Sequence, residues 1–124
     1  MKLLGIDYGE KRVGVAYTEG KLATPLTEYS LSEAVVRIQK LRETIPFERC
    51  VIGLPSGYLE AKVKHFGQQL QLNGLEVVYW DETLSSHSAR LLLSDTHTRK
   101  KRKQQEHKTA AAVILQAYLD EGIG

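Results

Sequence analysis

The chain has 124 residues, of which 42% are hydrophobic and 26% charged, and its formal net charge is +2. This composition predicts one soluble domain, residues 1–124, that is long enough to bury a core, and we expect no membrane span and no secretory signal. The single cysteine, Cys50, excludes an internal disulfide and fits a reducing cytoplasm. Its apolar surroundings favour a buried thiol over a nucleophile.

The N-terminal part of the chain predicts an antiparallel meander. Apolar runs over residues 2–7, 13–19 and 22–29 are separated by the turns YGEKR and GK, a spacing typical of three consecutive paired strands. Ser30, with Glu33 three residues later, has the pattern of a capping box at a helix start. The helix that follows ends before a proline, and its apolar face is Val35, Ile38, Leu41 and Ile45.

The rest of the chain alternates strands and helices. We expect strands over residues 50–55 and 75–80, with a helix between them that stops at Asn73–Gly74 and has the apolar stripe Val63, Phe66 and Leu70. A helix through 89–93, a basic loop and a helix over 107–122 complete the chain. The order β-β-β-α-β-α-β-α-α predicts an α/β fold: a mixed five-stranded sheet, antiparallel meander then parallel crossovers, flanked by helices.

Three carboxylates are predicted at one end of this sheet. Asp7 ends the first strand, and Asp81 and Glu82 follow the fifth. Functional groups of crossover sheets gather beyond the carboxyl ends of strands. A charge inside an apolar run costs several kcal/mol to bury unless it is paired. Asp7 therefore requires a partner.

His107 is a fourth candidate for the same site. It begins the last predicted helix and shares one face with Ala111, Ile114 and Tyr118. Carboxylates with an imidazole suit Mg²⁺ or Mn²⁺. Two such ions, about 3.5–4 Å apart, can activate a water and stabilise the leaving oxygen in phosphodiester cleavage. The pattern therefore predicts a metal ion as the partner of Asp7.

Each of these residues also has a purely structural interpretation. Asp7 could bind the backbone amides of the following turn. Asp81 and Glu82 could complement the dipole of a helix that follows them. His107 could be a hydrogen-bonded core residue.

One segment concentrates positive charge. Five consecutive cations make a basic cluster on an otherwise slightly acidic chain: Arg99, Lys100, Lys101, Arg102 and Lys103. Such a cluster predicts contact with a polyanion, and a solvated loop is the alternative.

Four motifs in a fixed order span nearly the whole chain: GIDYGEKRVGVA, VIGLP, DETLSS and RKKRK…HKTAAAVILQAYLD. Together they resemble the YqgF/RuvX family, whose members are described as Holliday junction resolvases and as nucleases that mature pre-16S ribosomal RNA. The first motif alone is weak, because actin-like kinases and ATPases carry a similar phosphate loop. The resemblance implies a ribonuclease H-like fold, in agreement with the strand order above.

The resemblance also implies a set of site residues. An acidic residue on the first strand is matched by Asp7, and an Asp-Glu pair after a later strand by Asp81 and Glu82. The family usually has an aspartate where this chain has His107, and commonly an arginine where it has Thr83; its loop after GLP is longer. Histidine keeps a metal ligand but removes a negative charge, which weakens binding of a second ion or turns the residue into a general acid or base. Thr83 lacks a cation that could contact phosphate or hold a carboxylate.

The leading hypothesis is a metal-dependent endonuclease that hydrolyses phosphodiester bonds in structured nucleic acid, in pre-16S rRNA 5′-end processing or Holliday junction-like resolution. A two-ion site would use Asp7, Glu82 and His107, with Asp81 as a further catalytic residue that binds an ion or contacts a ligand. Strand alternation favours Glu82 over Asp81 as the inward residue. The expected phosphate contacts are the basic cluster, Lys11 and Arg12. Tyr8 could stack on a base or pack as a half-buried strand residue.

Two other functions stay open. A nucleic-acid-binding ribosome-assembly factor with weakened catalysis would bind RNA without cleaving it. An actin-like nucleotide-binding domain would need a second domain to enclose its nucleotide. The expected partners are structured RNA or branched DNA and ribosomal precursor particles, with no membrane. Junction resolution needs two symmetric cuts and hence a twofold homodimer, whereas RNA trimming needs only a monomer.

Overall fold

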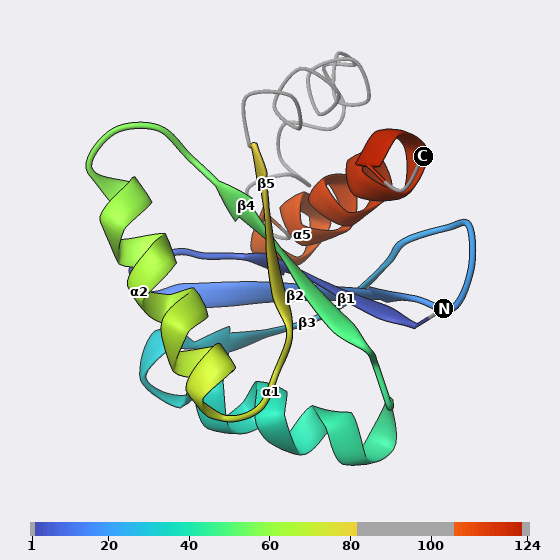
Figure 1. Cartoon of the computed structure of the whole chain (residues 1–124), viewed down its shortest axis with the longest axis horizontal. Coiled ribbons are helices and arrows are strands. Elements are labelled where there is room, and N and C mark those ends of the chain that lie inside the picture. Colours follow the sequence, from blue (N-terminus) through green and yellow to red (C-terminus); the bar gives the residue numbers. More distant parts are fainter. Residues whose placement is uncertain (1, 82–105, 123–124) are drawn as a thin grey trace.

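The computed structural model describes residues 2–81 and 106–122, which form a five-stranded mixed sheet with helices on both faces (Figure 1). The strand order is β3-β2-β1-β4-β5. β1 pairs antiparallel with β2, and β2 with β3, whereas β1 pairs parallel with β4, and β4 with β5. The strands are β1 (Leu3–Asp7), β2 (Arg12–Thr18), β3 (Thr24–Ser30), β4 (Arg49–Leu54) and β5 (Val77–Asp81). The predicted meander followed by parallel crossovers is confirmed.

The helices divide between the two faces of the sheet. α1 (Leu31–Thr44) and α2 (Leu59–Leu72) cover one face, and α5 (Glu106–Ala117) covers the other (Figure 1). The helix predicted over 107–122 ends differently, because its last residues form a π-helical turn, η1 (Tyr118–Gly122). The helix predicted through 89–93 lies outside the described residues.

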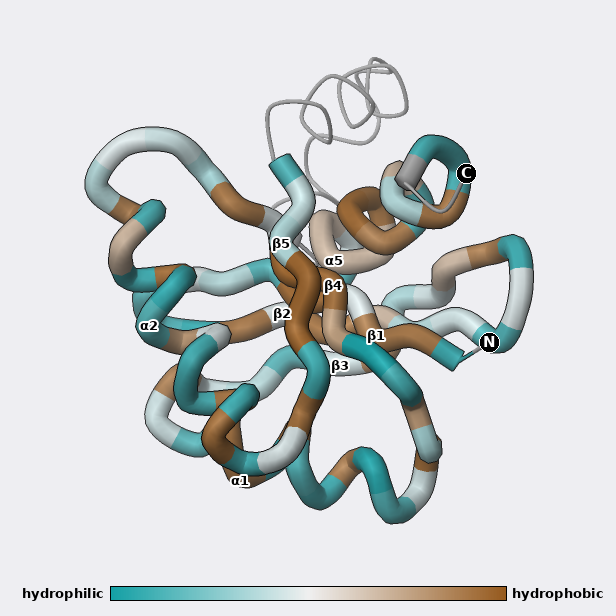
Figure 2. Tube along the Cα trace, viewed as in Figure 1, coloured by the Kyte–Doolittle hydropathy of each residue, from teal (hydrophilic) through white to brown (hydrophobic). Residues whose placement is uncertain are grey.

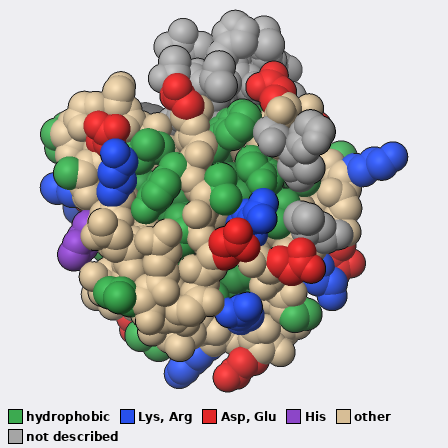
Figure 3. Space-filling view, in the orientation of Figure 1, with side chains coloured by type: hydrophobic (Ala, Val, Ile, Leu, Met, Phe, Trp, Pro, Cys, Tyr) green, Lys and Arg blue, Asp and Glu red, His purple; other side chains and the backbone are tan. Residues whose placement is uncertain are grey.

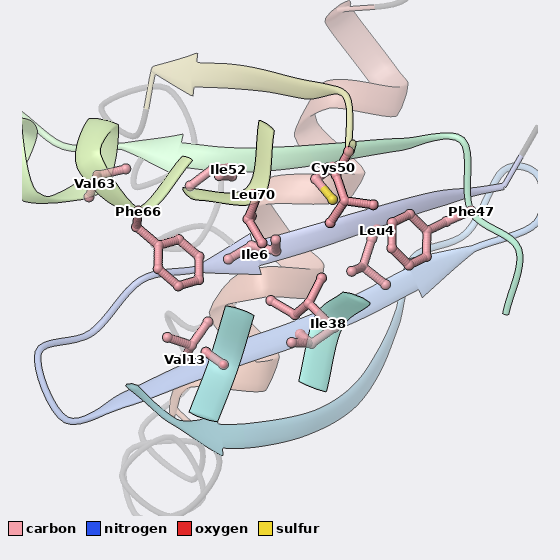
Figure 4. Close-up of a cluster of buried hydrophobic side chains, with 13 residues drawn as sticks. Leu4, Ile6, Val13, Ile38, Phe47, Cys50, Ile52, Val63, Phe66 and Leu70 are labelled. Atoms are coloured by element: carbon pink, nitrogen blue, oxygen red, sulfur yellow. The ribbon is translucent and has the colours of Figure 1, made fainter. Parts of the chain in front are cut away.

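The larger core fills the space between the sheet and the α1–α2 layer. Inward side chains of β1, β2 and β4 meet the apolar faces of both helices (Figure 4). The predicted stripe of α2 is buried, as is Ile38 of α1. In Figure 2, hydrophobic stretches lie in the central strands and hydrophilic ones in the turns. Successive side chains of a strand point to opposite faces of the sheet, and Leu4 and Ile6 of β1 are the two that lie in this core.

The opposite core lies under α5. It contains Leu3, Ala16 and Val51 from the strands, packed against Ala111 and its neighbours on the helix. Of the four positions predicted to share a helix face, the three apolar ones are buried, with exposed fractions of 0% for Ala111, 2% for Ile114 and 7% for Tyr118. α5 lies so close to the sheet that a Cβ added at Gly5 of β1 would come within 2.7 Å of the Ala111 carbonyl oxygen. Asp7 is on this face of β1, two residues after Gly5.

The start of α1 and the end of α2 match the predicted positions, but one predicted interaction does not form. Ser30 precedes α1, yet its side chain makes no capping hydrogen bond. The Leu31 N–H donates to the Lys11 carbonyl, and Glu33 pairs instead with Arg37 at 3.7 Å. The capping-box prediction is therefore wrong: the Ser30 side chain caps no N–H group of α1, and the Glu33 carboxylate lies against Arg37.

The predicted stop of α2 is confirmed. Gly74 has φ +85, and Gly74 and Leu75 donate their N–H groups to Gln71 and Leu70. These two bonds are those of a Schellman motif, in which a glycine in the left-handed region ends a helix.

The surface carries charges of both signs, and hydrophobic side chains gather beside the half-buried strand β5 in the view of Figure 3. In the part of the chain that the structure describes, no helix is both long and apolar enough to cross a membrane.

The buried thiol of Cys50 gives a first test of this fold. Burial raises the pKa of Cys50 to about 12, against a smaller opposite effect of the Arg42 charge. The folded thiol is therefore neutral at pH 8, and the thiolate is the reactive form. We expect no labelling by Ellman's reagent in the native protein and complete labelling in guanidinium. Rapid native labelling would contradict the placement of Cys50 in the core.

Candidate active site at the carboxyl ends of the strands

Three residues on adjacent strands form one row across the sheet. Asp7 of β1 lies opposite Gly14 of β2, and Gly14 lies opposite Glu28 of β3. A Cβ added at Gly14 would collide with the carbonyl group of His107, so this row faces the first turn of α5. The row therefore presents a carboxylate on either side of a position without a side chain, and the helix start occupies that position.

Glu28 anchors the first turn of α5. Its Oε2 accepts hydrogen bonds from the backbone N–H groups of His107 and Lys108, each at 3.2 Å. Its Oε1 accepts a bond from Arg12 Nε, also at 3.2 Å. The first N–H groups of a helix have no partner within the helix. Glu28 therefore provides, from the sheet, an acceptor for two N–H groups of this first turn.

Asp7 meets the side chain of His107. Asp7 Oδ2 lies 2.9 Å from His107 Nδ1. The Asp7 side chain is only 11% exposed and that of His107 31%. The residue that required a partner thus has one that is 100 positions away in the chain. Asp7 and His107 are hereafter the Asp7–His107 pair.

The donor chemistry of this pair fits part of a metal site. The separation of 2.9 Å suits a hydrogen bond. It also suits two ligands of one octahedral ion, which stand about 3 Å apart when each is about 2.1 Å from the metal. In that second case Nδ1 carries no proton, so the ion takes the place of the hydrogen bond. Among the described residues, no three His, Cys, Asp or Glu side chains gather as a metal site. In the described part of the chain the pair offers one oxygen and one nitrogen donor, and Glu82, the other predicted ligand, lies outside the described residues.

Asp81 ends β5, with β4 between it and β1. Strands two places apart are about 10 Å apart. Trp80 packs in the core under α5, so alternation assigns Asp81 to the opposite face of the sheet. Asp81 and Asp7 thus share an end of the sheet and lie on different faces of it.

The predicted nucleic-acid contacts are described only in part. Lys11 and Arg12 are exposed in and after the β1–β2 turn, and Arg12 is paired with Glu28. The basic cluster 99–103 and Thr83 lie outside the described residues. Tyr8 is half-buried, and its ring packs against Phe66 with centroids 5.5 Å apart, as in the packing alternative.

A polar cluster that the sequence did not predict connects two segments at the carboxyl ends of the strands. Glu10 accepts hydrogen bonds from Lys62 Nζ at 2.7 Å and from the Tyr58 hydroxyl at 3.2 Å. The bond from Lys62, then that from Tyr58, lowers the pKa of Glu10. Glu10 raises the pKa of Lys62 in return. The cluster connects the turn after β1 to the start of α2.

Sequence reasoning also missed Glu28. Its only signal is its place in β3, three residues after Pro25. Its role becomes visible once the register sets it opposite Gly14. That register depends on a shift in the β2–β3 ladder, where Val15 pairs with Thr27 and Ala16 with Pro25.

Comparison with known proteins shows the family of this chain. The family model RuvX, described as "Holliday junction resolvase", matches residues 1–121. The chain belongs to the RuvX family. A relative from Syntrophomonas wolfei is 37% identical, with 98% of this chain and 96% of the relative covered. A relative from Bacillus cytotoxicus is 39% identical, with 97% and 98% covered. Both carry the name "Putative pre-16S rRNA nuclease".

Solved structures agree with the ribonuclease H-like fold expected for a RuvX chain. Thermus thermophilus RuvC in complex with a Holliday junction substrate has a TM-score of 0.63 at 14% identity, with 98% of this chain and 96% of that chain covered. The fowlpox virus resolvase bound to Holliday junction DNA has a TM-score of 0.62 at 9% identity, with both chains fully covered. At these identities the likeness concerns the fold.

The Asp7–His107 pair gives a test of whether Asp7 is there for stability. Asp7→Asn keeps an oxygen that can accept a bond from Nδ1–H but removes a nearly buried charge. We expect a melting temperature in EDTA at pH 8 equal to that of the wild type or higher, because burying a carboxylate is costly.

A fall of about 4–8 °C, which corresponds to about 1 kcal/mol in a domain near this size, would instead mark Asp7 as a residue that stabilises the turn. The matched control is Glu33→Ala, which removes an exposed carboxylate from an i,i+4 pair.

Proposed function

We propose that this protein is a metal-dependent endonuclease that hydrolyses phosphodiester bonds in structured nucleic acid. The observation that carries the proposal is the Asp7–His107 pair, which lies at the carboxyl end of β1 in a chain of the RuvX family. We favour 5′-end processing of pre-16S rRNA, because relatives with that name are similar over nearly their whole length. Holliday junction-like resolution is the second candidate, supported by the family's description and by the fold.

We assign the metal ligands to Asp7, Glu82 and His107. Alternation along β5 supports Glu82 over Asp81, because Trp80 packs under α5 on the face of Asp7 and the next residue points away from it. We assign Asp81 to the surroundings of the site. Mg²⁺ or Mn²⁺, with two ions expected, would supply an activated water and neutralise charge on the leaving oxygen.

The Asp7–His107 pair also defines what the imidazole can do. With Nδ1–H donated to Asp7, the neutral ring keeps a lone pair on Nε2. Asp7 then fixes both the orientation and the tautomer of His107, and Nε2 can take up or release a proton or bind an ion. The partial burial of both side chains limits competition from water for this hydrogen bond.

We assign substrate binding to phosphate contacts. Lys11 and Arg12 lie next to the strand end that carries Asp7, and the basic cluster 99–103 precedes α5 in the chain. Such contacts orient a nucleic acid without reading its sequence. Because trimming of an RNA end needs one cut, we propose that a monomer suffices for it, in the cytoplasm on ribosomal precursors.

A cleavage assay separates the candidate functions. The protein is incubated with a precursor 16S rRNA fragment and with a four-way DNA junction, each with Mn²⁺, with Mg²⁺ and with EDTA. We expect metal-dependent cleavage of the RNA. Cleavage of the junction alone would favour resolution, and salt-sensitive binding without any cleavage would favour the ribosome-assembly alternative. Saturable binding of ATP in calorimetry would favour the nucleotide-binding alternative.

Replacement of His107 tests its role. We expect His107→Ala to weaken Mn²⁺ binding in a calorimetric titration while it keeps the helix, since alanine is the best helix former. His107→Asp should tighten binding of a second ion and extend activity below pH of about 6.5, where an ordinary imidazole becomes protonated. Identical titrations for wild type, Ala and Asp variants would show that His107 only packs.

Neutralisation of the basic cluster tests nucleic-acid binding. Replacing Arg99, Lys100, Lys101, Arg102 and Lys103 by Gln or Ser should weaken binding and lower the slope of log affinity against log salt. The slope falls by up to about 4.5 units on duplex if all five contact phosphates. The free energy of unfolding should change by no more than about 0.5 kcal/mol, as for most surface substitutions. An unchanged slope would show that the cluster is merely solvated.

A further inference from the structure

We propose that Glu28 is a positioning residue: it holds the first turn of α5 on the sheet so that the His107 ring meets Asp7. This inference rests on the function proposed for the Asp7–His107 pair. It starts from three contacts that converge on one turn of helix from three neighbouring strands.

The first contact is unusual in its origin. Helix N-termini are commonly capped by a side chain that directly precedes the helix. Here the acceptor for the His107 and Lys108 N–H groups is a carboxylate from β3, which is 79 positions before His107 in the chain. A local cap would stabilise the turn wherever it lay. A cap that belongs to the sheet also fixes where on the sheet the turn lies.

The other two contacts determine how close α5 lies to the sheet and where the His107 ring lies. Gly14, between Asp7 and Glu28 in the row, lets the backbone of α5 approach β2 so closely that a Cβ there would collide with the His107 carbonyl. Glu28 holds the backbone of His107 on one side of Gly14, and Asp7 holds its ring on the other. A shift of α5 by one residue, about 1.5 Å along its axis, would break the 2.9 Å contact with Asp7.

Glu28 is itself held in place. Arg12 Nε binds Oε1 at 3.2 Å, which leaves Oε2 for the two backbone N–H groups. The Glu28 side chain is 19% exposed and that of Arg12 56%, so the carboxylate is shielded and its partner faces the solvent. A carboxylate at a helix N-terminus also interacts favourably with the helix dipole. The charge of Glu28 thus strengthens the same bonds that locate His107.

The experiment compares Glu28→Ala, Glu28→Gln and the wild type. The matched control is Glu33→Ala, which removes a glutamate from the first turn of α1, where it pairs only with Arg37 among the interactions seen. The first readout is the ¹⁵N resonance of His107 Nδ1 in metal-free protein at one fixed pH, assigned with His107→Ala. The second is the affinity for Mn²⁺ alone, measured by calorimetry. Circular dichroism reports whether the helices remain.

We expect Glu28→Ala to shift the Nδ1 resonance and to weaken Mn²⁺ binding about 10- to 100-fold, the usual effect of losing a group that orients a metal ligand. Glu28→Gln keeps one oxygen that can accept both N–H bonds, so it should restore most of both signals. Glu33→Ala should match the wild type. If Glu28→Ala does not fold, Arg12→Ala takes its place and should give a smaller change in the same direction.

An unchanged Nδ1 resonance in Glu28→Ala would overturn the inference, even if the melting temperature falls, because a cap that only stabilises the helix predicts that result. Failure of the proposed function looks different. If the wild type neither binds Mn²⁺ nor cleaves nucleic acid, but the Nδ1 resonance moves in Glu28→Ala and recovers in Glu28→Gln, the metal site is wrong and the positioning role of Glu28 stands.

Discussion

The close approach of α5 to β2 at Gly14 is the constraint on which the candidate site depends. Because Gly14 has no side chain, the first turn of the helix lies directly against the sheet, between the carboxylates of Asp7 and Glu28. Glu28 accepts hydrogen bonds from two backbone N–H groups of this turn, and Asp7 contacts the imidazole ring of His107. A larger residue at position 14 would displace the helix start and separate both pairs at once.

The same packing explains how Asp7 is tolerated in a nearly buried position. Ile6 before it belongs to the core under α1 and α2, whereas Asp7 faces the start of α5, where polar groups are concentrated. A carboxylate in such a place is stabilised by its partners or is costly to the fold. The partner of Asp7 is a group that can itself bind a metal or transfer a proton.

Local sequence patterns predicted the layers well and individual hydrogen bonds less well. Alternating strands and the stripe of Val63, Phe66 and Leu70 follow from periods of 2 and 3.6 residues, which are properties of neighbouring positions. The capping box at Ser30 and Glu33 is also a local pattern, yet Lys11 of the β1–β2 turn supplies the acceptor at that helix start. The spacing of Ser30 and Glu33 does not show which group each side chain contacts, and Glu33 lies against Arg37.

The sequence by itself determined the order of strands and helices, the buried cysteine, the motifs of the family and the residue types of the site, among them Asp7 and His107. Only the tertiary structure decided that these two side chains are 2.9 Å apart and that Glu28 and Arg12 complete the surroundings of the helix start. The physical reason is register. Which residues stand opposite each other depends on a register shift in the β2–β3 ladder, where Leu26 of β3 has no partner, and on how close α5 lies to the sheet. Both depend on contacts between different segments of the chain.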